Sequence, residues 1–141
     1  TALKVGRRRL GEDAAKIEKI GSSKDVYEIL QPLLGDLEHE EFWILFLNNS
    51  NKVLHKAQLS KGGITGTLVD VRIVMKQALE LGAVAIILAH NHPSGTLRPS
   101  AADKQITQKI KVASETLDIK VLDHLIITQK DYFSFADNQI L

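Results

Sequence analysis

Two histidines and an aspartate occur at a spacing that could hold a metal ion. His90 and His92 follow an apolar run, and Asp103 comes shortly after them. Side chains at positions i and i+2 of a strand lie on the same face, so both imidazoles would point the same way. The chain contains no cysteine, which excludes disulfides, thiolate metal sites and cysteine nucleophiles. Any metal must therefore be held by nitrogen and oxygen atoms.

The segments around these residues predict how they are positioned. Residues 83–89 form a continuous apolar run between two helical stretches, which is typical of a central strand covered on both faces. Residues 100–116 show helical periodicity, and Asp103 shares a stripe with Ile106, Thr107 and Ile110. Because this stripe must face the sheet, Asp103 is predicted to point towards the histidines. A buried carboxylate needs a partner, and a bound cation would provide one.

A simpler interpretation exists for the start of this helix. Ser100-x-x-Asp103 is also a capping box, in which the two side chains satisfy backbone N–H groups at the helix N-terminus. That role explains both residues without any chemistry. The two interpretations are compatible, since Ser100 can begin the helix while its hydroxyl faces the metal.

The remaining periodicity predicts the order α, β, β, α, β, α, β, β. Ser22 to Asp25 form a capping box before a helix that Pro32 ends or bends, and residues 41–47 and 52–59 form a hairpin around an Asn-rich turn. A helix closed by Gly82 precedes the apolar run, and strands at 119–128 and 132–135 follow the last helix. This order indicates an α/β fold, a three-layer α-β-α sandwich with a mixed central sheet.

Composition and charge limit the possible partners. The chain has 141 residues, 44% hydrophobic and 25% charged, which is typical of one globular domain. No apolar run is long enough to span a bilayer, and no signal peptide is evident. The net charge is +1, but residues 1–16, which include Arg7, Arg8 and Arg9, sum to +3 and the rest to −2. The body of the domain therefore has no basic character that would favour nucleic acid.

A family resemblance emerges from these residues. His90-x-His92-x7-Ser100-x2-Asp103 resembles the JAMM signature of the JAB1/MPN metalloprotease superfamily. The stretches A-H-N-H-P-S-G (89–95), P-S-A-A-D (99–103) and L-D-H-L-I-I-T (122–128) are similar to its bacterial RadC branch, historically named for DNA repair. The resemblance implies a JAB1/MPN-like (cytidine-deaminase-like) fold. It also implies that residues 22–141 form this domain, and that residues 1–21 are a linker and the end of an N-terminal helical domain.

The resemblance also implies roles for individual residues. His90, His92 and Asp103 resemble zinc ligands, with a water in the fourth position, and Ser100 resembles the hydroxyl that stabilises an oxyanion. A glutamate from an earlier strand acts as general base on that water in the superfamily. The family pattern E-x-F matches Glu40, whereas Glu41 would point to the opposite face. His124 matches the family and is expected to be structural or a hydrogen-bond partner near the site.

These features lead to two functional hypotheses. The first is a cytoplasmic zinc-dependent hydrolase of amide bonds, peptide or isopeptide, acting on a peptide or protein. The second is a DNA-associated module that binds or processes nucleic acid, supported only by the Arg7–Arg9 cluster; a metal-binding scaffold without turnover is a further alternative. Specificity is expected to lie in loops 61–67 and 93–99, whose sequence does not identify a ligand.

Overall fold

The chain folds around a five-stranded mixed sheet with helices on both faces. The computed structural model describes residues 18–61 and 69–141, so residues 1–17 of the predicted linker 1–21 and most of loop 61–67 lie outside the described residues. The elements, in order, are α2 (Ser23–Leu34), β1 (Glu41–Leu47), β2 (Val53–Lys61), α3 (Val71–Leu81), β3 (Ala85–Asn91), α4 (Ala101–Thr116), β4 (Lys120–Ile127) and β5 (Tyr132–Ser134). Over the described residues, the predicted order of helices and strands is confirmed.

The strands lie in the order β2-β1-β3-β4-β5. β1 pairs antiparallel with both β2 and β3, while β3 and β4 run parallel and are connected through α4. β3 is therefore the central strand, and all seven of its residues are buried. It begins two residues later than predicted and continues through His90 and Asn91, so only His92 lies beyond the strand end.

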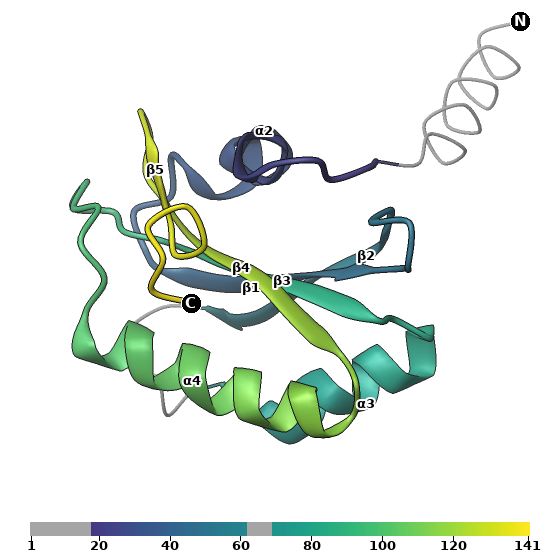
Figure 1. The fold of residues 1–141 in the computed structure, drawn as a ribbon. Helices are drawn as coiled ribbons and strands as arrows, with labels where there is room; N and C mark the ends of the chain where they lie inside the picture. Colours follow the sequence, from purple (N-terminus) through teal and green to yellow (C-terminus); the bar gives the residue numbers. More distant parts are fainter. Residues whose placement is uncertain (1–17, 62–68) are drawn as a thin grey trace, which may run out of the picture.

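The helices form two layers, one on each side of the sheet. α2 covers one face, while α3 and α4 lie side by side across the other (Figure 1). Each interface has its own apolar core: Ile44, Ile86 and Ile110 belong to the core beneath α3 and α4, and Leu30 and Ile87 to the core beneath α2. Alternation along β1 and β3 supplies both cores, as expected for strands buried on two faces. The three-layer α-β-α arrangement is thus the predicted one.

Local sequence signals explain where the helices begin and end. Asp70 caps α3 by accepting a hydrogen bond from Arg72 N at 2.9 Å, and Gly82 ends it with φ at +66°. Pro32 lies inside the last turn of α2, which continues to Leu34, so the predicted end of the helix at this proline is wrong. Among the described residues, no helix is both long and apolar enough to cross a membrane.

A β-bulge changes the direction of side chains along β4. Ile86 pairs with Val121, but the next residue, Ile87, pairs with Asp123, which leaves Leu122 as the extra residue. Because one inserted residue reverses the alternation, His124 faces the α3/α4 side of the sheet together with Val121. This local irregularity places a histidine beneath the N-terminal part of α4.

Candidate metal centre

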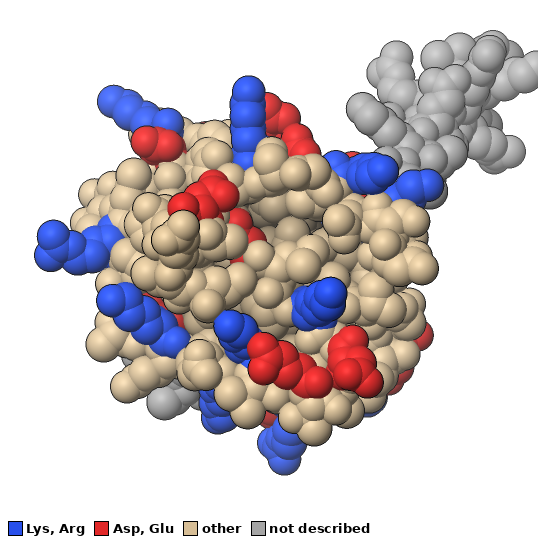
Figure 2. All heavy atoms as spheres, in the orientation of Figure 1, with Lys and Arg blue, Asp and Glu red and all other residues tan. Residues whose placement is uncertain are grey.

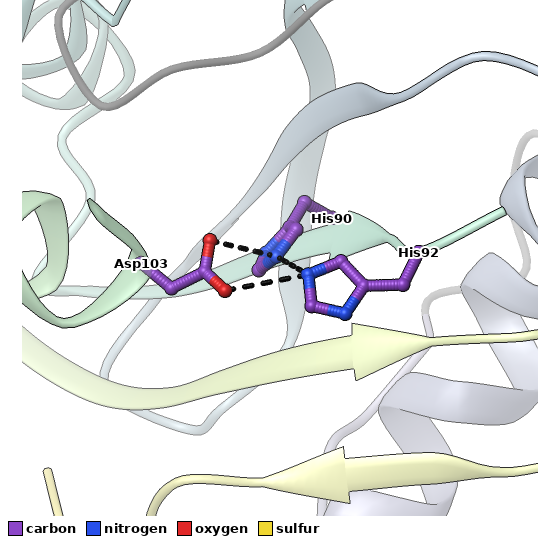
Figure 3. Close-up of side chains that lie close together, drawn as sticks. All are labelled: His90, His92 and Asp103. Atoms are coloured by element: carbon purple, nitrogen blue, oxygen red, sulfur yellow. Dashed lines mark hydrogen bonds and ion pairs between the residues drawn. The ribbon is translucent and has the colours of Figure 1, made fainter. Parts of the chain in front are cut away.

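The side chains of His90, His92 and Asp103 converge at the end of β3 (Figure 3). His90 Nε2 lies 2.9 Å from His92 Nε2 and 3.1 Å from Asp103 Oδ1, and His92 Nε2 lies 3.3 Å from Asp103 Oδ2. β3 presents His90 on its α4 face, His92 follows directly after the strand end, and the first turn of α4 directs Asp103 at both. The predicted convergence of the two strand-end histidines with the inward-facing aspartate is therefore present.

The second nitrogen of each histidine ring is already engaged in a hydrogen bond. His92 Nδ1 lies 2.7 Å from the backbone oxygen of Thr96, which can only accept, so this nitrogen donates. Gly95, with φ at +85°, permits the turn that brings Thr96 back to the ring. His90 Nδ1 lies 2.8 Å from His124 Nε2. Both histidines thus direct Nε2 at the carboxylate.

This donor set fits a metal ion. Two Nε2 lone pairs and a carboxylate brought so close together repel one another unless a proton or a cation lies between them. Ligand atoms bound tetrahedrally to zinc at its usual bond lengths lie about 3.3 Å apart, close to the separations of 2.9–3.3 Å in this cluster. Three nitrogen and oxygen ligands also match the ligand number of open, catalytic zinc sites.

The close approach of these side chains shifts their pKa values. Burial alone would raise the pKa of Asp103, but its close interactions with His90 and His92 outweigh burial and hold this pKa well below its usual range. Burial lowers the pKa of His92, yet the hydrogen bonds to Asp103 and to Thr96 outweigh it, so the pKa is raised. Burial also lowers the pKa of His124 far below the ordinary value.

Glu40 and Glu41 lie on opposite faces of the sheet edge. Phe42 pairs with His90 in the antiparallel β1–β3 ladder, and continuing that register brings Glu40 opposite His92. The negative charge of Glu40 contributes to raising the pKa of His92. Glu41 is instead buried and hydrogen-bonded to His39 Nε2 at 2.7 Å and to Trp43 Nε1 at 3.0 Å. Of the two carboxylates, Glu40 is the one beside the histidine pair.

Ser100 occupies the N-cap position of α4. Its Oγ accepts a hydrogen bond from Asp103 N at 3.0 Å, and Asp103 Oδ2 accepts one from Ser100 N at 2.8 Å. The hydroxyl, and not only the backbone, therefore takes part in the capping box that the sequence predicted. Since the oxygen acts as acceptor there, the hydroxyl proton remains able to donate to another group.

Two residues with no predicted role contact residues that neighbour the candidate ligands. Thr107, one turn after Asp103 on the same stripe, places its Oγ1 2.5 Å from His124 Nδ1. Asn91, between the two histidines, is buried with its side chain on the opposite face. It accepts a hydrogen bond from Glu41 N at 2.7 Å and donates one to His39 O at 2.9 Å. Helical spacing could have indicated Thr107, but no pattern indicated the contacts of Asn91.

A surface cavity lies next to the loop that follows the histidines. Its volume is about 670 Å³, and it is lined by residues 35–38, 93–95 and 128–130. The predicted specificity loop 93–99 thus borders an open depression at the same end of the sheet. The other predicted specificity loop, 61–67, lies outside the described residues apart from its first residue.

Comparison with known proteins places the chain in a family whose domain type fits the fold described above. The sequence model of the family described as the RadC-like JAB domain matches residues 20–140. The chain belongs to the RadC family of JAB domains. It is 66% identical to a UPF0758 protein of Flavobacterium johnsoniae over 139 residues, 99% of this chain and 61% of that protein. It is 45% identical to a UPF0758 protein of Porphyromonas gingivalis over 141 residues, 99% of this chain and 62% of that protein.

This RadC-type chain spans about three fifths of the length of those relatives. The family membership confirms the resemblance drawn from the His-x-His and Ser-x-x-Asp spacing, and the JAB-type fold agrees with the three layers seen here. The cluster of His90, His92 and Asp103 is a group that could hold a metal ion in such a domain.

Proposed function

We propose that this domain is a zinc-dependent hydrolase of amide bonds, either peptide or isopeptide. One observation supports this most strongly: two imidazoles whose Nδ1 atoms are each already hydrogen-bonded direct their Nε2 atoms at one carboxylate. His90, His92 and Asp103 would hold the ion. When bound, zinc polarises the substrate carbonyl and lowers the pKa of the water that attacks it.

Glu40 has the position of a general base. It lies at the strand end opposite His92, half-buried and on the same face as the histidines. In the proposed reaction its carboxylate takes a proton from the attacking water and delivers it to the amide nitrogen as the C–N bond breaks. One proton thus moves from the water to the leaving amine, and the new C–O bond completes the carboxylic acid product.

Ser100 has a hydroxyl group that could donate a hydrogen bond to the carbonyl oxygen of the substrate. Its oxygen is engaged in the helix cap, whereas its proton is available. A hydroxyl fixed at a helix N-terminus is a suitable donor to the negative charge that develops on the carbonyl oxygen. Ser100 is exposed, so a substrate can reach it.

The nucleic-acid alternative has less support. On the face drawn in Figure 2, basic and acidic side chains are interspersed, without a continuous basic patch. The Arg7–Arg9 cluster, on which this alternative rests, lies outside the described residues. The peptide or protein substrate and the cytoplasmic location stay predictions.

The experiment compares zinc-loaded variants in a screen of peptide and isopeptide substrates. Glu40→Gln is expected to keep its zinc and to lose hydrolysis by a factor of about 10²–10⁴, since it removes the proton acceptor alone. Glu41→Gln is the matched control, because that residue faces the opposite side and should retain hydrolysis. Zinc binding without any turnover in the unchanged chain would indicate the scaffold alternative.

A further inference from the structure

The ligands His90 and Asp103 are connected by a second route through two buried side chains. His90 Nδ1 lies 2.8 Å from His124 Nε2, and His124 Nδ1 lies 2.5 Å from Thr107 Oγ1. Thr107 Oγ1 in turn lies 2.6 Å from the backbone oxygen of Asp103. The chain of hydrogen bonds therefore begins on one candidate ligand and ends on the main chain of another.

The direction of every hydrogen bond in this chain can be deduced. A backbone carbonyl can only accept, so the Thr107 hydroxyl must give its single proton to Asp103 O. Thr107 Oγ1 can then only accept from His124, which places a proton on His124 Nδ1. A neutral His124 has an acceptor at Nε2, and the proton in the last hydrogen bond must belong to His90 Nδ1.

The surroundings of His124 keep its ring neutral and in place. The ring is fully buried, stacks on Phe135 with centroids 4.6 Å apart, and meets Phe42 edge-on at 5.6 Å. Burial between aromatic rings disfavours an imidazolium. The neighbouring Asp123 carboxylate accepts from the main-chain N–H of His124 and from Ser134 Oγ. The ring is thus held by aromatic packing and by its two nitrogen contacts.

We propose that Thr107 and His124 are positioning residues that hold His90 in its Nδ1–H tautomer, so that Nε2 is always free to bind metal. This inference rests on the proposed metal site but does not require turnover. If the direction of the hydrogen bonds were reversed, His90 Nε2 would bear the proton and could not be a ligand. Since the acceptor is a neutral imidazole, the tautomer is set without adding negative charge beside the metal.

The test uses Thr107→Val, which keeps the shape of the side chain and removes its hydroxyl. His124 Nδ1 then loses its acceptor, and the opposite tautomers of His124 and His90 become accessible. Loss of such an outer hydrogen-bond partner typically weakens metal binding by about 10- to 100-fold. Thr107→Ser retains the hydroxyl and should bind zinc like the unchanged chain. Ser114→Ala is the matched control, because Ser114 is another buried hydroxyl of α4 and contacts Met75 instead.

Two measurements serve as readouts. Zinc affinity is measured by competition with a chelator, and the histidine tautomers of the zinc-free chain are identified from their ring ¹⁵N chemical shifts. We expect Nδ1–H tautomers for His90 and His124 in the unchanged chain and in Thr107→Ser, and a mixture in Thr107→Val. The inference is overturned if Thr107→Val keeps both the tautomers and the zinc affinity, or if zinc-free His90 is protonated on Nε2.

These outcomes can be told apart from a failure of the proposed function. A chain that binds zinc with the expected tautomers but hydrolyses nothing supports the inference and contradicts the hydrolase. A chain that hydrolyses peptides while Thr107→Val keeps both its histidine tautomers and its zinc affinity contradicts the inference alone. If Thr107 were merely structural, Thr107→Val would lower the free energy of unfolding without altering the ¹⁵N shifts, as is expected of Ser114→Ala.

Discussion

The side-chain amide of Asn91 holds the backbone on both sides of Glu40. Its Oδ1 accepts from Glu41 N at 2.7 Å, and its Nδ2 donates to His39 O at 2.9 Å. Asn91 lies between the two histidines in sequence and points to the opposite face of the sheet. The strand that presents the candidate ligands therefore also fixes the segment that contains the candidate base.

Replacing Asn91 by alanine should separate metal binding from catalysis. We expect zinc to be retained, because the histidines do not change. Hydrolysis should fall by about 10- to 100-fold, because Glu40 is no longer held in register and small misplacements of catalytic groups are costly. The free energy of unfolding should also fall by about 1–3 kcal/mol, since buried backbone groups lose their hydrogen-bond partners. Zinc content, turnover and urea denaturation measure the three effects.

Asn48→Ala is the matched control for that experiment. Asn48 Oδ1 accepts from Ser50 N and Lys52 N at 2.9 and 3.0 Å in the turn after β1, at the strand end away from the histidines. This variant should lose stability and keep its turnover. Equal losses of turnover in the two variants would mean that Asn91 acts through stability alone.

Substitutions of Ser100 should distinguish helix capping from catalysis. Aspartate is as good an N-cap as serine, but its ionised carboxylate has no proton to donate to a carbonyl oxygen. Ser100→Asp is therefore expected to keep the stability of the chain and to lose about 10²–10³-fold in turnover. Ser100→Thr should preserve both. If Ser100→Asp hydrolyses substrate at the normal rate, Ser100 is only a cap.

The buried carboxyl of Asp123 should give stability a measurable pH dependence. Burial raises its pKa and outweighs the hydrogen bonds from Ser134, Ala136 and His124. The folded chain therefore keeps this proton to a higher pH than the unfolded chain does. Its contribution to stability is most favourable below the ordinary pKa of about 3.9 and decreases as pH rises through the raised value.

Asp123→Asn removes this titration and retains groups able to pair with Ser134. The stability of the variant, relative to the unchanged chain, is expected to increase as pH rises from about 4 to 7. Urea denaturation of the zinc-free proteins at several pH values measures this difference. A difference that stays constant over that range would contradict a raised pKa of Asp123 in the folded chain.

The parts of the site that the sequence predicted are those that depend on residues close together in the chain. His90 and His92 share a face through strand alternation, and Asp103 faces inward through helical spacing with Ile106 and Ile110, so both could be predicted locally. The capping box at Ser100 was likewise a local signal. The fold class followed from the order of helices and strands because short connections and buried central strands leave few alternatives.

Contacts that depend on long-range register could not be predicted in this way. His124 faces the site because of the bulge at Leu122, and a pairing irregularity leaves no mark in hydrophobic alternation. The contacts of Asn91 depend on the β1–β3 register, which only the folded sheet defines. Thr107 was placed correctly on the inward stripe, but its role depends on the position of His124.

The most direct test of this account is the zinc content of the chain after equilibrium dialysis, measured by elemental analysis. We predict about one zinc ion per chain, as in open sites with three protein ligands, and its loss in His90→Ala and in Asp103→Ala. The Glu40→Gln variant should retain it, since that residue is not a proposed ligand. A folded chain with His90, His92 and Asp103 intact that takes up no metal would contradict the account.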